Sequence, residues 1–173
     1  MTVQGWLHRF NRWQRLLTWG MCSVAVCLLV LAKPGVAVQS ADQPSPNTLL
    51  TQGHQAYEAG QLQQAKQQWQ QAAHGYGQRH QPVDAALSLS YLALSYQELG
   101  QWQQAEQTIQ QSLVLLEDNQ APASVLARVF NTYGRIQLAL GQPAAALATW
   151  QKATAYYEAL DDPVGQLGSQ LNQ

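Results

Sequence analysis

The segment SLSYLALSYQELGQWQQAEQTIQQSL, residues 88–113, carries the clearest structural signal in the chain. Apolar and small side chains recur in it at helical spacing on both sides of Gly100. They are Leu89, Leu92, Ala93 and Tyr96 before the glycine, and Trp102, Ala105, Ile109 and Ser112 after it. Because a glycine between two helical periods favours a turn, the segment predicts two helices folded back on each other.

The same pattern recurs upstream and downstream of this segment. Three glycines and three prolines repeat at intervals of 40 and then 41 residues, and each proline lies 22 residues beyond its glycine. They are Gly60, Gly100 and Gly141, and Pro82, Pro122 and Pro163. A helical hairpin cannot bury both of its faces alone, so a regular period of this length predicts an array in which neighbouring hairpins cover one another. The expected fold class is therefore all-α.

Superposing the units gives each position a role. One position of the first helix is always small, as Gly53, Ala93 or Gly134, which is expected to let the second helix approach. The second helix carries a small, a large and a small residue at i, i+4 and i+7, a spacing that places all three on one helical face. The three sets are Ala65, Trp69 and Ala72; Ala105, Ile109 and Ser112; and Ala146, Trp150 and Ala153.

These positions resemble the tetratricopeptide repeat (TPR) over residues 46–173. The motif residues are Gly53, Tyr57, Gly60, Leu62, Ala65, Trp69 and Ala72. The resemblance implies tandem antiparallel helical hairpins in a short right-handed solenoid. The expected units are 46–81, 82–121, 122–162 and an incomplete 163–173. Because the family's usual unit has about 34 residues, this chain is similar to the longer-unit type.

Two further phrases, FNTYGRIQLALGQPAAALATWQKA (residues 130–153) and DDPVGQLGSQLNQ (161–173), look like exported cyanobacterial repeat proteins. In many of those proteins a caspase-like CHAT domain follows the repeats. The short fourth unit has two interpretations. It is either a terminal capping helix, as repeat arrays require, or the start of a further unit in a truncated protein. Gly165 and Gly168 make it a weak cap, which favours truncation slightly.

Residues 1–37 are predicted to be a targeting segment. Three arginines, Arg9, Arg12 and Arg15, precede an uncharged apolar run over residues 16–32. Such a run directs the following chain across the cytoplasmic membrane, towards the periplasm or the exterior. Its 17 residues suit either a cleaved signal peptide or a retained signal anchor, which needs about 20. Cleavage after Ala37 is favoured, and residues 38–45 then form a polar linker.

The remaining composition argues against several kinds of chemistry. From residue 38 onward there are five basic and ten acidic residues and no cysteine, so a nucleic-acid interface and a cysteine nucleophile are not expected. Neither His74 nor His80 has a carboxylate or cysteine at metal-binding spacing. We therefore expect no enzymatic activity, no metal and no cofactor.

The surface expected to bind a partner is formed by the first helices, which line the concave side of related solenoids. Side chains one step round from the core are expected to form a lane across the units, with Leu87 and Leu94 exposed and with Arg128, Asn131 and Arg135 side by side. An arginine beside an asparagine is suited to a peptide carboxylate or backbone. The lane comprises Asn47, Leu50, His54 and Tyr57; Leu87, Ser90, Leu94 and Gln97; and Arg128, Asn131, Arg135 and Leu138.

The sequence thus predicts an exported scaffold that binds a protein or peptide and has no catalysis of its own. Two alternatives remain at this stage. One is the non-catalytic repeat region of a CHAT-type protease. The other is an envelope-assembly factor held in the membrane by residues 16–32.

Overall fold

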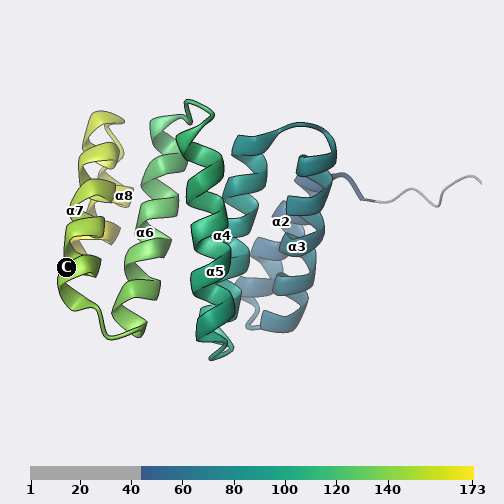
Figure 1. Cartoon of the computed structure of the whole chain (residues 1–173), viewed down its shortest axis with the longest axis horizontal. Helices are drawn as coiled ribbons and strands as arrows, with labels where there is room; N and C mark the ends of the chain where they lie inside the picture. The colour runs from purple at the N-terminus through teal and green to yellow at the C-terminus, as the bar shows by residue number, and fades with distance from the viewer. Residues whose placement is uncertain (1–43) are drawn as a thin grey trace, which may run out of the picture. The chain divides into compact units, whose positions relative to one another are not determined.

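The structure is a computed structural model that describes residues 44–173, and these form seven α-helices and no strand (Figure 1). The predicted signal peptide or anchor and most of the linker lie outside the described residues. None of the seven helices combines the length and hydropathy needed to span a bilayer. The helices are α2 (Pro46–Glu58), α3 (Leu62–Gln78), α4 (Pro82–Glu98), α5 (Trp102–Glu117), α6 (Ala123–Ala139), α7 (Pro143–Ala159) and α8 (Pro163–Leu171).

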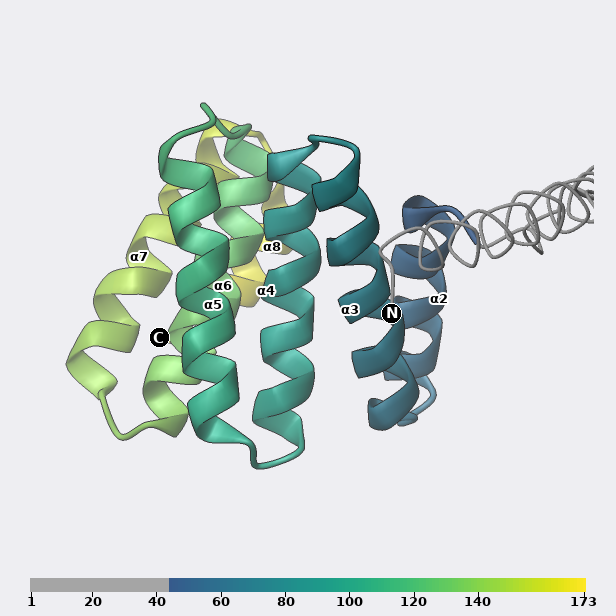
Figure 2. The ribbon, with the colours of Figure 1, turned by 45° about the vertical axis from the view of Figure 1, so that its right-hand side comes forward.

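Consecutive helices pair as three hairpins, α2–α3, α4–α5 and α6–α7, and α8 packs on α7. The first helix α4 also contacts α3 of the preceding hairpin and α6 of the following one. Figures 1 and 2 show the hairpins following one another in chain order, from α2 and α3 at one end to α7 and α8 at the other. The all-helical fold is therefore as the sequence predicts, and each hairpin covers its neighbours.

The helix starts follow from local sequence chemistry. The Ser45 hydroxyl accepts a hydrogen bond from the Thr48 amide at 3.1 Å, and the Asp162 carboxylate accepts one from the Gly165 amide at 2.9 Å. Both residues cap a helix that opens with proline, which lacks the amide hydrogen that a first turn leaves unsatisfied. The opening helix is shorter than its counterpart in the next hairpin, since α2 has 13 residues and α4 has 17.

The turns within hairpins and the turns between hairpins use different residues in the left-handed conformation. Gly60, Gly100 and Gly141, which end the first helix of each hairpin, all have φ between 69° and 76°. That left-handed region strains residues with a Cβ, which explains the periodic glycines. The turns between hairpins also contain a left-handed residue, but there it is not glycine. These residues are His80, Gln120 and Asp161, with φ of 55°, 45° and 52°.

A tryptophan seated against a glycine holds the first hairpin together. A Cβ built on Gly53 would lie 2.4 Å from Trp69 Nε1, so only glycine admits the ring at this distance. The Trp69 indole N–H donates to the Leu50 carbonyl at 3.2 Å, and the ring is completely buried. This confirms that the small position of the first helix allows the second helix to approach.

The same arrangement recurs in the third hairpin. There a Cβ on Gly134 would lie 2.5 Å from Trp150 Nε1, and the indole N–H donates to the Asn131 carbonyl at 3.2 Å. The middle hairpin has the complementary sizes at these positions, Ala93 and Ile109, both completely buried. A larger first-helix residue is thus matched by a smaller second-helix residue, which conserves the packed volume.

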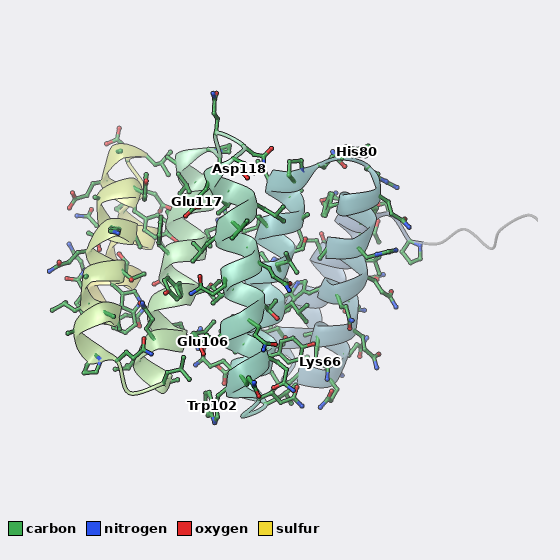
Figure 3. The ribbon with its side chains drawn as sticks, in the orientation of Figure 1. Lys66, His80, Trp102, Glu106, Glu117 and Asp118 are labelled. Atoms are coloured by element: carbon green, nitrogen blue, oxygen red, sulfur yellow. The ribbon has the colours of Figure 1, made fainter. Side chains whose placement is uncertain are left out.

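The helix α3 continues through Gly75 and Gly77 and ends at Gln78. Gly75 is required for packing, because a Cβ there would lie 2.7 Å from Pro46 Cγ of α2. Trp102 was expected on the buried stripe of α5, but its side chain is 44% exposed at the first position of that helix (Figure 3).

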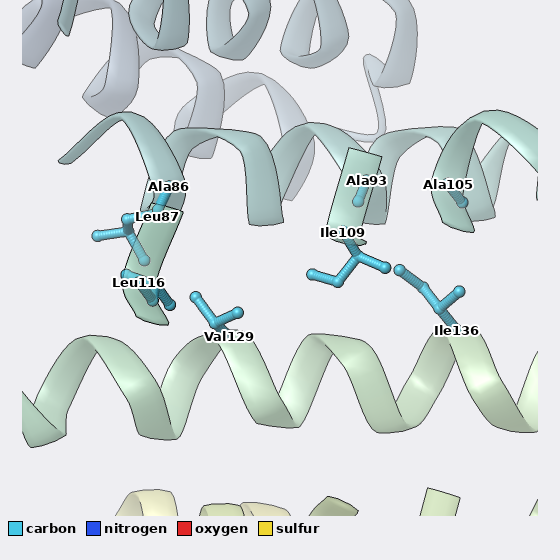
Figure 4. Packing of buried hydrophobic residues seen from close by; sticks show 8 residues of the cluster. All are labelled: Ala86, Leu87, Ala93, Ala105, Ile109, Leu116, Val129 and Ile136. Atoms are coloured by element: carbon cyan, nitrogen blue, oxygen red, sulfur yellow. The ribbon is translucent and has the colours of Figure 1, made fainter. Parts of the chain in front are cut away.

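The largest core cluster lies where three helices meet. It joins the middle hairpin to α6 and includes Leu87 of α4, Leu116 of α5 and Val129 of α6. Figure 4 shows these three side chains pointing toward one another between the helices. The first helix of one hairpin is therefore partly covered by the first helix of the next.

Candidate protein-binding surface

Part of the predicted lane is buried in the structure, namely three of its four residues on α4. Leu87, Ser90 and Leu94 of α4 are buried, with exposed fractions of 9%, 0% and 8%. The expectation that Leu87 and Leu94 are exposed is wrong, since both are buried, and Leu87 lies in the core cluster that α4 and α5 share with α6. These three buried residues cannot contact a partner in the folded array.

Three other lane residues lie together at a hollow of about 350 Å³. It is bounded by α4, α6, α7 and α8. Leu138 and Leu171 stand at its rim with 50% and 78% of their side chains exposed. The hollow combines exposed apolar surface with one cation and two side-chain amides. Its lining residues are Gln97, Arg135, Leu138, Ala139, Trp150, Leu171 and Asn172.

Two side-chain amides line the hollow, and the Gln97 amide keeps an oxygen unpaired within residues 44–173. The Gln97 Oε1 atom is buried and has no hydrogen-bond partner among the described residues. Asn172, which follows the last residue of α8, donates from Nδ2 to Asn131 Oδ1 of α6 at 3.1 Å, and this bond fixes both amides. Because an unpaired buried amide oxygen costs free energy, a donor entering the hollow would be stabilised at Gln97.

Arg135 is held at the hollow by a carboxylate from the neighbouring hairpin. Its Nη2 lies 2.7 Å from Glu98 Oε1 in the only salt bridge between described residues. The Tyr57 hydroxyl of α2 donates to the same oxygen at 3.4 Å. Glu98 thus links the first helices of all three hairpins, and it places Tyr57 and Arg135 in one row.

A second group of lane residues lies one turn earlier on α2 and two turns earlier on α6 than Tyr57 and Arg135. His54 of α2 is half-buried, with its ring 4.3 Å from Tyr91 and 5.3 Å from Trp69. Arg128 of α6 is exposed and belongs to no salt bridge or cation–π pair of the described residues. Its charge acts on His54, although 74 positions of sequence separate the two lane residues.

Burial lowers the pKa of His54 from its ordinary value of 6.5. Arg128 lowers this pKa further, while Glu58, one turn along α2, raises it. The uncharged ring is therefore the form that packs against Tyr91 and Trp69. Because the unfolded chain keeps the ordinary pKa, it binds more protons than the folded chain below neutral pH.

The folded array is expected to lose stability as pH falls through 6.5 toward the lower folded pKa of His54. The urea midpoint of the full chain at pH 7.5 and at pH 5.5 measures this loss. His54→Phe keeps a ring against Tyr91 and is expected to reduce the difference between the two midpoints. His80→Gln, at an exposed histidine, is the control. An equal difference in the wild type and His54→Phe would contradict the prediction.

No group of three or more potential metal ligands occurs among residues 44–173. Sequence reasoning did not find Glu98, Tyr91, Trp150, Leu171 and Asn172 as parts of this surface. Glu98 had a usable signal, since it lies four residues after Leu94 and therefore on the same helical face. The places of Leu171 and Asn172 depend on how α8 docks, which no period in the sequence specifies.

The fold and this surface define a helical repeat protein with a hollow on its first-helix side. A family model described as Tetratricopeptide repeat matches residues 84–159. Residues 84–159 therefore carry repeats of the tetratricopeptide family, as the sequence predicted. Such repeats typically serve as non-catalytic scaffolds for interactions between proteins.

The remaining comparisons add little. A search of curated proteins found no match. Among solved structures, the crystal structure of BtubC (BKLC) from P. vanneervenii matches with 16% sequence identity and a TM-score of 0.48. The match covers 78% of this chain and 64% of that chain.

Proposed function

We propose that the chain is a scaffold without catalysis that captures a segment of a partner protein in the hollow between α4, α6 and α8. The carrying observation is that exposed Leu138 and Leu171 stand beside Arg135 and the unpaired Gln97 oxygen in one depression. Apolar surface with a few placed polar groups is the usual composition of a recognition site. A segment bearing an apolar side chain and a polar neighbour fits this chemistry.

The tetratricopeptide match supports a protein as the partner, and the packing of the helices supports the hollow as its binding site. In the middle hairpin the first-helix surface is used for packing against α6, which leaves the part next to α8 open. A volume of about 350 Å³ accommodates only a few side chains. We therefore propose a short linear segment as the ligand, with only its anchoring residues inside the hollow.

Selection of a random peptide library on the immobilised full chain tests this proposal. Leu171→Glu is expected to reduce enrichment of the selected peptides at least tenfold, because it places a carboxylate where an apolar anchor would pack. The matched control is Val164→Glu, which adds the same charge to α8 at an 81% exposed side chain outside the hollow. Equal enrichment on both variants and on the wild type would contradict the proposed site.

We also propose that the module acts outside the cytoplasm. Support comes from the three arginines followed by the uncharged run over residues 16–32. Cell fractionation followed by amino-terminal sequencing tests this proposal. A mature chain that starts at Val38 is the expected result. A membrane-bound chain with residues 16–32 intact would support the anchored alternative, and recovery from the cytoplasm would contradict export.

A further inference from the structure

Among the described residues, Arg135 is the only cation that lines the hollow, and its guanidinium is already paired with the Glu98 carboxylate. The two side chains are 33% and 35% exposed, so water and a ligand can both reach them. Glu98 itself does not line the hollow. Its carboxylate comes from α4 and is held from the far side by the Tyr57 hydroxyl.

The other cations on this part of the chain differ from Arg135. Lys66 lies over the Tyr96 ring at 5.6 Å, and Lys152 lies over the Phe130 ring at 5.9 Å. Neither lysine lines the hollow, nor do the other two arginines among residues 44–173, Arg79 and Arg128. The described residues carry more acidic than basic groups, so a partner carboxylate approaching this surface is repelled except where a guanidinium is available.

We infer that Glu98 is a specificity-determining residue that holds the place of a partner's carboxylate on Arg135. This inference rests on the proposed function of the hollow and names the ligand as a segment with a carboxylate next to its apolar anchor. When such a segment binds, its carboxylate replaces that of Glu98 on the guanidinium. Glu98 then remains hydrogen-bonded to Tyr57. A ligand without a carboxylate leaves the internal pair intact.

The expected change in affinity follows from the solvent exposure of the Glu98 and Arg135 side chains. An ion pair about one third exposed changes an equilibrium by up to about fivefold. Glu98 therefore weakens the binding of every carboxylate ligand by up to this factor, while it leaves the apolar contacts of Leu138 and Leu171 unchanged. Removing its charge is expected to favour carboxylate ligands alone.

Two fluorescein-labelled pools of random pentapeptides with leucine at the last position provide the probe. One pool has a free terminal carboxylate and the other an amidated terminus. Fluorescence polarisation with the full chain is expected to show the carboxylate pool binding about threefold to fivefold more tightly to Glu98→Gln than to the wild type. Binding of the amidated pool is expected not to change. Arg135→Gln is expected to abolish the preference for the carboxylate.

Glu58→Gln is the matched control. Glu58 occupies the equivalent position 40 residues earlier, loses the same charge and forms no salt bridge in the described part of the chain. Affinity for both pools should stay at the wild-type value in this variant. If Arg135→Gln weakens binding but Glu98→Gln does not strengthen it, the inference is wrong and the proposed function stands. If Leu171→Glu binds both pools as the wild type does, both are wrong.

Discussion

Gly134→Ala is expected to lower the free energy of unfolding by about 2 kcal/mol, although alanine is the better helix former. The added Cβ would lie 2.5 Å from Trp150 Nε1, and the Trp150 ring is only 3% exposed. The ring cannot move away without breaking its hydrogen bond to the Asn131 carbonyl. Urea denaturation of the full chain, followed by circular dichroism, measures the loss.

Gly168→Ala is the matched control, since a Cβ at Gly168 of α8 meets nothing within 4 Å. It is expected to gain up to about 1 kcal/mol from helix propensity alone. If Gly134→Ala also raised stability, the close contact between glycine and tryptophan would not limit packing.

Size exchange between the two positions gives a further check. Gly134→Ala combined with Trp150→Ile reproduces the pair that the middle hairpin uses, Ala93 with Ile109. The double variant is expected to be more stable than the sum of the single losses predicts, by about 1–2 kcal/mol. Strict additivity would show that the two sites do not share one packed volume.

Leu87→Glu is expected to cost about 3 kcal/mol or more, because it places a carboxylate in the cluster formed by α4, α5 and α6. Leu87 contacts this cluster, where Val129 of α6 is completely buried. A surface residue would tolerate the change. The thermal unfolding midpoint of the full chain therefore distinguishes a buried Leu87 from the exposed one that the sequence suggested.

Arg128→Glu provides the control at the equivalent position of the next hairpin. Arg128 is exposed, so this larger change of charge is expected to alter stability by no more than about 0.5 kcal/mol. If both variants unfolded at the same temperature, the packing of α6 across α4 would not be as described.

The hairpins were predictable from the sequence because their determinants are local. The interval between Gly60, Gly100 and Gly141 marks the turns, and the pairing of Gly53 with Trp69 follows from one helix facing the next. These relations lie within one hairpin. Periodicity therefore predicts that a small first-helix residue lets the second helix approach, and the structure shows Gly134 against Trp150.

The surface was less predictable because it depends on contacts between hairpins. Asn47, Leu87 and Arg128 occupy equivalent positions, yet only Leu87 is buried. The middle hairpin has a neighbour on both sides, and its apolar residue at this position was the available signal. The partners of Arg135 could not be inferred, since Glu98 reaches it from another hairpin at a distance that no repeat length specifies.

Two buried tryptophans, Trp69 and Trp150, can report on unfolding through their fluorescence. Trp69 and Trp150 are buried in the outer hairpins, whereas the middle hairpin carries Ile109 at the same position. Indole emission from the two ends can therefore be followed separately once the other tryptophans are replaced. Repeat arrays unfold either in one step or from their ends, and a difference between the two denaturation curves would measure the cooperativity that couples distant hairpins.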